Sequence, residues 1–219
     1  AGFAHAQMED QMVKHEQRDW SHFALLLVDV QQSFWPARGR PDFPDFPANV
    51  TRLLALCRAE GLEVIHVRSR FKPDKSDWML MYRLRVVPVS HHPCVAGQEG
   101  EKPVSFAVEE PGELVVYKQT FDALHSPDLL PYLRQNDKRV ILVAGLLTSV
   151  CVLFTAASAA QLGFLAAVVE DCCADNPKNH KRTLDEYAFM FERTTTDAIC
   201  HQHAKWLAAL AELDGNGVG

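Results

Sequence analysis

The chain has 219 residues, of which 47% are apolar and 23% charged, and its formal net charge is −6. This length and composition predict one domain with enough apolar side chains for a hydrophobic core. The negative charge and the lack of a basic stripe argue against a nucleic-acid partner. No apolar run reaches the roughly 18 residues of a membrane span, so no membrane association is expected.

In chain order, short apolar runs alternate with helical patterns. They predict a strand at 23–30, a helix at 47–61, strands at 62–69 and 113–118, a helix at 126–135, a strand at 138–145, a helix at 148–162, a strand at 164–171, a helix at 176–193, a short strand at 193–196 and a helix at 196–213. This alternation is typical of an α/β domain with a mostly parallel sheet.

Local signals mark the ends of these elements. Gly61 suits the position after the first helix, and Ser126 is the expected N-cap of the second. Pro131 fits that second helix only near its first turn. Residues 70–112 are rich in proline and glycine and lack periodicity, which predicts a lid or binding loop.

The chain ends and the cysteines give further expectations. We predict residues 1–20 as an N-terminal extension that is in part a tag or disordered, 21–213 as the folded domain and 214–219 as a disordered tail. The first residues lack the apolar core of a signal peptide, so a cytoplasmic protein is expected, with unconventional export left open. The six cysteines form no C-x-x-C pair, which favours free thiols, and the neighbours Cys172 and Cys173 face opposite ways.

Three reactive residue types stand at the carboxyl ends of predicted strands: Asp29, Lys118 and Cys151. Taken singly, they could be a loop carboxylate, a lysine that reaches solvent and a small buried thiol. Ligands of parallel α/β sheets bind beyond the carboxyl ends of the strands, so the three side chains should meet in one cleft.

Their chemistry is complementary. A thiolate is a good nucleophile, and we expect Lys118 and the helix N-terminus to lower the pKa of Cys151. Asp29 can take the thiol proton and pass it to a leaving group. Backbone N–H groups at the start of the helix can hold a developing oxyanion.

The motifs VDVQQSF, K-x-x-x-D-A-L and G-x-x-T-x-x-C-V occur in this order. They resemble the isochorismatase-like cysteine hydrolase superfamily over residues 23 to 200. The resemblance implies a Rossmann-like three-layer α/β/α fold with six parallel strands and a catalytic triad of Asp29, Lys118 and Cys151. It also implies a cis peptide at Leu146–Leu147, an oxyanion hole from the N–H groups of Leu147 and Cys151, and pocket positions at Gln31, Phe34 and Thr148.

Family members differ in metal use. Nicotinamidases carry an Asp-x-His pair and a further histidine after the second strand, where this chain has Ser69 and Phe71. We therefore expect no metal and no cofactor. Histidine is a common metal ligand, so His91, His92, His201 and His203 are candidates by residue type alone. His201 and His203 are expected at the surface, because residues two apart on a helix face different directions.

The end of the predicted strand 62–69 and the loop after it carry four arginines, at positions 68, 70, 83 and 85. Arginine binds carboxylates with two parallel hydrogen bonds, so Arg70 and Arg83 are predicted to hold an anionic small-molecule substrate. This favours hydrolysis of isochorismate, in which Asp29 would protonate the vinyl ether. Asp122 departs from the serine that the family commonly has there, which puts substrate contacts at this position in doubt.

Two alternatives stay open. One is a metal-independent C–N hydrolase for an amide, carbamoyl or ureido compound that forms a thioester on Cys151. The other is a binding protein that kept the fold without turnover, and the intact set of three residues counts against it. By analogy with the family, a homodimer or homotetramer is expected.

Overall fold

A computed structural model describes residues 18–35, 41–85 and 88–215. Its centre is a six-stranded sheet in the order β3-β2-β1-β4-β5-β6, and all neighbouring strands are parallel. The strands are β1 (Phe23–Val28), β2 (Glu63–Ser69), β3 (Leu114–Lys118), β4 (Val140–Leu146), β5 (Leu165–Ala174) and β6 (Glu192–Thr194). The predicted six-stranded parallel sheet is confirmed.

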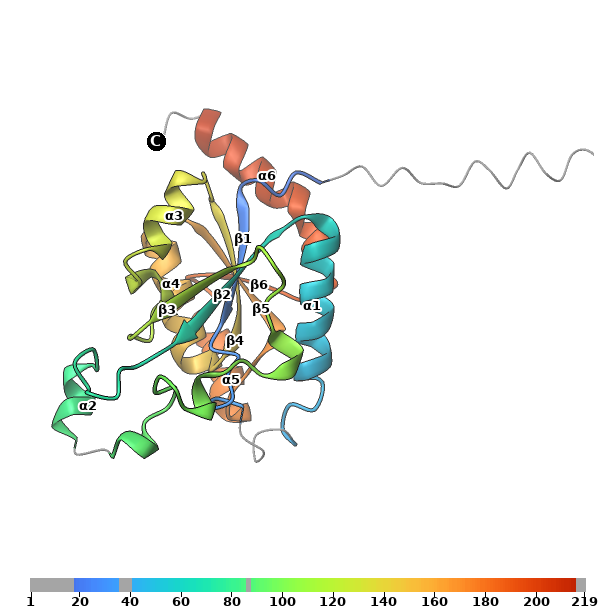
Figure 1. The fold of residues 1–219 in the computed structure, drawn as a ribbon. Coiled ribbons are helices and arrows are strands. Elements are labelled where there is room, and N and C mark those ends of the chain that lie inside the picture. Colours follow the sequence, from blue (N-terminus) through green and yellow to red (C-terminus); the bar gives the residue numbers. More distant parts are fainter. Residues whose placement is uncertain (1–17, 36–40, 86–87, 216–219) are drawn as a thin grey trace, which may run out of the picture.

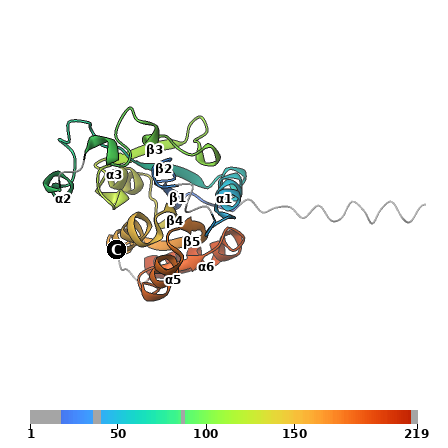
Figure 2. The same cartoon turned by 90° about the horizontal axis from the view of Figure 1, so that it is seen from below.

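Helices cover both faces of this sheet (Figures 1 and 2). They are α1 (Phe46–Glu60), α3 (Leu129–Gln135), α4 (Leu153–Gln161), α5 (Pro177–Glu186) and α6 (Ile199–Gly215), whereas α2 (Leu80–Leu84) lies away from the sheet in the loop between β2 and β3. Apolar side chains of α1 and α6 pack on one face, and those of α3, α4 and α5 pack on the other. The predicted three-layer α/β/α architecture is therefore confirmed. No helix among the described residues is long and apolar enough to cross a bilayer.

Several helix boundaries differ from the sequence prediction: the predicted helix 148–162 is helical in the α form only from Leu153 to Gln161, and the predicted helix 196–213 runs from Ile199 to Gly215. Two further differences, in α3 and α5, have a clear local cause. Helix α3 begins at Leu129 with Asp128 before it, rather than at Ser126, because a 3₁₀ turn, Ala123–His125, comes first. Pro131 consequently falls in the first turn, where its missing N–H has no intrahelical partner to lose. Helix α5 ends at Glu186, seven residues early, because the chain turns there and leads into β6.

Gly145 allows β4 to pass close to β1 at the edge where both strands end. Its φ is +126°, and a Cβ atom there would lie 2.0 Å from the carbonyl oxygen of Val28. Any side chain would push the two strand ends apart. The glycine therefore lets the segment after β4 lie beside Asp29, which follows β1.

The start of the described chain and most of the cysteines belong to the hydrophobic cores on the two faces of the sheet. Trp20 is buried against Phe23 and His203, so residues 18–20 pack with the domain. Residues 1–17 and 216–219, where an extension and a tail are predicted, lie outside the described residues. All six cysteines are free, and Cys172 and Cys173 belong to the cores on opposite faces, as predicted.

Candidate active site

Asp29, Lys118 and Cys151 meet at the carboxyl edge of the sheet. The Lys118 Nζ donates to Asp29 Oδ2 at 2.7 Å and lies 3.5 Å from the Cys151 Sγ. All three side chains are buried. The convergence follows from the topology, because β1, β3 and β4 are parallel and each residue follows or ends its strand.

Ser69, the last residue of β2, completes this cluster, and the sequence reasoning assigned it no such role. Its N–H and its Oγ both donate to Asp29 Oδ1, at 2.8 and 2.9 Å. Its Oγ also accepts from Lys118 Nζ at 3.0 Å. The only available signal was its place at the end of a strand between those of Asp29 and Lys118.

Gln31 holds the segment after β1 in place and is not part of the cavity lining. Its Oε1 accepts from the Ser69 N–H at 2.9 Å, and its Nε2 donates to the carbonyl oxygens of Ser69 and Glu101 at 2.9 and 2.6 Å. With its whole amide engaged and the side chain fully buried, Gln31 supports Ser69 and the loop instead of touching a ligand.

Cys151 lies in a short π-helical turn, Thr148–Val152 (η6), which comes between β4 and α4. The peptide bond Leu146–Leu147 before this turn is cis, as the resemblance implied. The Leu147 N–H donates to no other described residue. Thr148 is fully buried and its Oγ1 lies 2.8 Å from His180 Nδ1, so the structure does not place it in the cavity.

A cavity of about 300 Å³ opens onto the Cys151 sulfur, at the lower end of the range for small-molecule sites. Phe34 lines it, as predicted. The loop between β2 and β3 supplies another large part of its wall. The remaining lining residues are mostly aromatic or apolar: Ser69, Phe71, Met79, Tyr82, His92, Pro93, Gln119, Thr120, Phe121, Leu147 and Val150.

The two arginines predicted to bind an anion lie outside this lining. Arg70 is half-exposed and pairs with Glu101 at 3.3 Å, and Arg83 is exposed on α2. Arg68 is buried in an ion pair with Glu109. No charged side chain is among the described residues that line the cavity. The described residues therefore give the predicted anionic substrate no cationic partner in the cavity lining.

The Asp122 carboxylate is bound by neighbouring residues of the protein itself. Its Oδ1 accepts from the Leu124 N–H at 2.8 Å and caps the 3₁₀ turn, and its Oδ2 lies 2.8 Å from His125 Nδ1. These bonds explain a carboxylate at this position.

The electrostatics of the nucleophile differ from the sequence prediction. Burial is the main cause that raises the pKa of the Cys151 thiol well above its usual value, and the charge of Asp29 adds to it. Lys118 opposes this rise but does not reverse it. Burial disfavours the charge on Lys118, yet Asp29 and Cys151 outweigh this, so that the pKa of Lys118 is raised. The prediction of a lowered thiol pKa is wrong, because the sequence did not reveal how deeply the sulfur is buried.

The described residues offer no evident metal site. They contain no group of three or more His, Cys, Asp or Glu side chains suited to hold a metal ion. Ser69 and Phe71 stand at the cavity, and the Ser69 hydroxyl is already committed to Asp29 and Lys118. His92 is buried in an aromatic cluster, stacked 3.8 Å from Trp78. His203 is buried instead of exposed, and its Nε2 bonds the Asp19 carbonyl oxygen.

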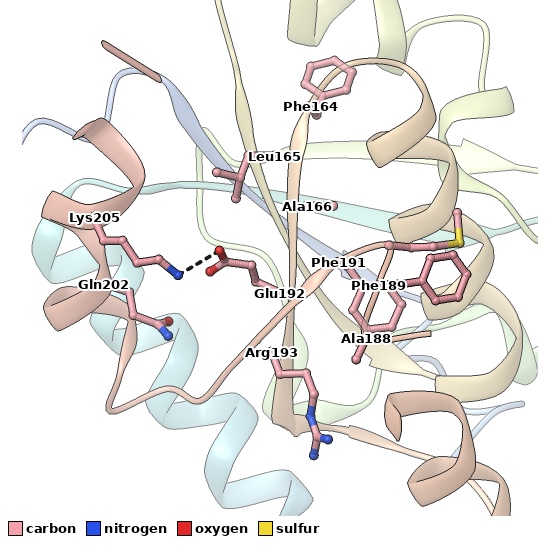
Figure 3. A pocket seen from close by; sticks show the side chains of 11 residues that line it. Phe164, Leu165, Ala166, Ala188, Phe189, Phe191, Glu192, Arg193, Gln202 and Lys205 are labelled. Carbon is pink, nitrogen blue, oxygen red and sulfur yellow. Dashed lines mark hydrogen bonds and ion pairs between the residues drawn. The ribbon is translucent and has the colours of Figure 1, made fainter. Parts of the chain in front are cut away.

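A second hollow of about 560 Å³ lies at the opposite edge of the sheet, where β5 begins (Figure 3). Its charged side chains form ion pairs: Lys205 with Glu192 at 2.9 Å and Arg193 with Glu170 at 2.6 Å. No cysteine is among the described residues that line it. We therefore place the chemistry at the cavity of Cys151.

An α/β sheet with a buried acid, lysine and thiol at its carboxyl edge indicates a hydrolytic enzyme. Residues 23–199 match the isochorismatase domain, and the chain belongs to the isochorismatase family of hydrolases.

One curated relative is an amidohydrolase by name and another is a nicotinamidase. The maleamate amidohydrolase of Pseudomonas putida is 29% identical over 189 residues, which cover 83% of this chain and 84% of that protein. The nicotinamidase of Escherichia coli is 28% identical over 209 residues, covering 84% and 96% of the two chains. Among solved structures, an isochorismatase family protein from Desulfovibrio vulgaris has a TM-score of 0.76 and 26% identity, covering 84% of this chain and 98% of that one.

Proposed function

We propose that this hydrolase cleaves the C–N bond of a small uncharged amide, carbamoyl or ureido compound through a thioester on Cys151. The observation that carries the proposal is the contact of Lys118 with both Asp29 Oδ2 and the Cys151 Sγ beside the cavity. An acid–base group, a cation and a nucleophile are then within reach of one carbonyl carbon. The names of the two relatives, an amidohydrolase and a nicotinamidase, support the same reaction class.

In the first half-reaction the Cys151 sulfur attacks the carbonyl carbon while its proton passes to the Asp29 carboxylate. Because burial keeps the thiol protonated at rest, this transfer accompanies the attack. Lys118 holds Asp29 in position and stabilises the negative charge on sulfur. The oxyanion that forms accepts hydrogen bonds from the N–H groups of Leu147 and Cys151.

The tetrahedral intermediate then breaks its C–N bond, and the proton on Asp29 goes to the leaving nitrogen. Ammonia or an amine departs, and the acyl group stays on Cys151 as a thioester. Asp29 next takes a proton from water, whose oxygen attacks the thioester carbon. The C–S bond breaks, the carboxylic acid is released, and the thiol recovers its proton.

The cavity wall supports an uncharged, flat substrate. Phe34, Phe71, Tyr82 and Phe121 offer aromatic surface, and a carboxylate placed against them would lose its water without a cationic partner among the described lining residues. Isochorismate carries two carboxylates. It was predicted as the substrate because Arg70 and Arg83 were expected to bind them, and both arginines lie outside the lining. We therefore prefer C–N hydrolysis to vinyl-ether hydrolysis.

Ammonia release from a panel of small amides, with nicotinamide as the uncharged and maleamate as the anionic member, tests the proposal. Pyruvate release from isochorismate is measured in parallel. We expect turnover of an uncharged amide that is abolished in Cys151→Ala. Pyruvate release that survives Cys151→Ala would instead support vinyl-ether hydrolysis, and inactivity on the whole panel would favour a binding protein.

A further inference from the structure

The turn that carries Cys151 is held by a carboxylate that lies directly after another strand, β5. Asp175, which follows β5, accepts two hydrogen bonds from Ser149 on its Oδ2: one from the N–H at 2.8 Å and one from the Oγ at 2.6 Å. Its Oδ1 accepts from the Asn176 N–H at 2.6 Å. The Asp175 carboxylate is therefore fixed on one side and holds Ser149 on the other.

This contact replaces a missing helix cap. The residue that precedes the turn, Leu147, offers no side-chain hydrogen bond to its first N–H groups. Free N–H groups at a helix start are usually satisfied by a side chain at the N-cap position. Asp175 performs this function from the position directly after β5, so the start of the turn is tied to the end of the neighbouring strand instead of to its own preceding residue.

Ser149 is the midpoint of the proposed catalytic segment. It lies two residues after Leu147 and two residues before Cys151, whose N–H groups are the proposed oxyanion donors. A displacement of Ser149 would move both donors and the sulfur relative to Asp29 and Lys118. Reaction rates respond strongly to such displacements, since a misplacement of about 1 Å can cost about 100-fold.

The neighbouring residue has a second, independent anchor. The Thr148 Oγ1 lies 2.8 Å from Nδ1 of His180, which belongs to α5. His180 in turn packs edge-on against Phe43, with ring centroids 5.1 Å apart. Two consecutive residues of the turn are thus held by the segment that runs from the end of β5 into α5.

We propose that Asp175 is a positioning residue that holds the Leu147–Cys151 segment in its reactive geometry through Ser149. This inference rests on the proposed thioester mechanism. It assigns Asp175 no contact with the substrate, so its loss lowers kcat while leaving KM nearly unchanged.

The test compares Asp175→Ala, Ser149→Ala and the double variant. For an amide that the wild type hydrolyses, Asp175→Ala should lower kcat about tenfold or more and change KM less than about twofold. The double variant should be no slower than Asp175→Ala alone, because the two residues act through one contact. Asp175→Asn, which keeps one acceptor oxygen, should be intermediate.

Asp171→Ala is the matched control. Asp171 lies on β5. Its side chain contacts Thr196 and Arg52, at 2.9 and 3.3 Å, rather than the π-helical turn η6 that carries Cys151. We expect its kcat, corrected for the folded fraction, to stay within about twofold of wild type. An equal loss of kcat in Asp171→Ala and Asp175→Ala, or additive effects of Asp175→Ala and Ser149→Ala, would overturn the proposal.

A second measurement separates this inference from the proposed function. Hydrogen exchange of the amides in residues 147–153 needs no substrate. We expect faster exchange at Ser149 in Asp175→Ala, and unchanged exchange would overturn the anchor itself. If the exchange rises but wild type hydrolyses no amide, the proposed function fails while the contact remains, and the kinetic role assigned to Asp175 falls with it.

Discussion

Replacing Lys118 with methionine should destabilise the fold strongly. The Lys118 Nζ donates to Asp29 Oδ2 at 2.7 Å, to Ser69 Oγ at 3.0 Å and to the Thr120 carbonyl oxygen at 2.9 Å. Asp29 is fully buried, so the substitution leaves its carboxylate without a counter-charge in the described surroundings. Breaking one partner of a buried ion pair typically costs about 3–5 kcal/mol, and we expect a loss of unfolding free energy in this range.

Urea unfolding at pH 7, followed by fluorescence, measures this loss. The double variant Asp29→Asn/Lys118→Met should be more stable than Lys118→Met, since it leaves no uncompensated charge. Lys102→Met is the control: Lys102 is exposed and pairs with Glu99 at 2.7 Å, and its urea midpoint should not change. A loss below about 1 kcal/mol in Lys118→Met, or a double variant less stable than the single one, would refute this reasoning.

Three further predictions concern the same edge of the sheet. Ser69→Ala removes a buried hydroxyl that bonds Asp29 and an acceptor for Lys118, so we expect urea unfolding to show a loss of about 1–3 kcal/mol together with lower kcat. Gly145→Ala would place a Cβ 2.0 Å from the Val28 carbonyl oxygen, so its thermal midpoint should fall by several degrees; an unchanged midpoint would contradict the close approach. The raised pKa of Cys151 means that the folded protein favours the neutral thiol. This contribution to the free energy of unfolding is fully present below the unfolded thiol's pKa of about 8.5. It is lost as the pH rises through the higher pKa of the folded protein. Alkylation of Cys151 by iodoacetamide should therefore keep rising above pH 9, whereas a plateau below pH 8 would show that the pKa is not raised.

The sequence predicted the place of Asp29, Lys118 and Cys151 because their convergence depends on topology alone. Parallel strands bring their carboxyl ends to one edge, and the apolar runs before these residues identified the strands. The cis peptide at Leu146–Leu147 could be predicted only through the resemblance to the family, since no local pattern reveals it.

The wall of the cavity could not be predicted in the same way. A large part of it comes from the loop between β2 and β3, in which Tyr82 and His92 reach the cavity while Arg70 and Arg83 do not. Periodicity fixes which face of a strand or helix is buried, but it carries no information about loop side chains. The pattern of arginines therefore predicted an anionic substrate, for which the described lining residues supply no positive charge.

Burial depth explains the other differences. The raised pKa of Cys151 and the buried position of His203 both depend on how closely distant segments pack. Gln31 and Thr148 belong to motifs that resemble the family, yet their side chains bond to neighbouring residues. A motif locates such residues near the site without telling which of them face the ligand.

The central claim is that Cys151 forms a thioester during C–N hydrolysis. Rapid quenching in acid during turnover of an amide substrate, followed by peptide mass spectrometry, tests it most directly. We predict an added acyl mass on the peptide that contains Cys151 in the wild-type protein, and neither adduct nor ammonia release in Cys151→Ala. Ammonia release that persists in Cys151→Ala would contradict the account.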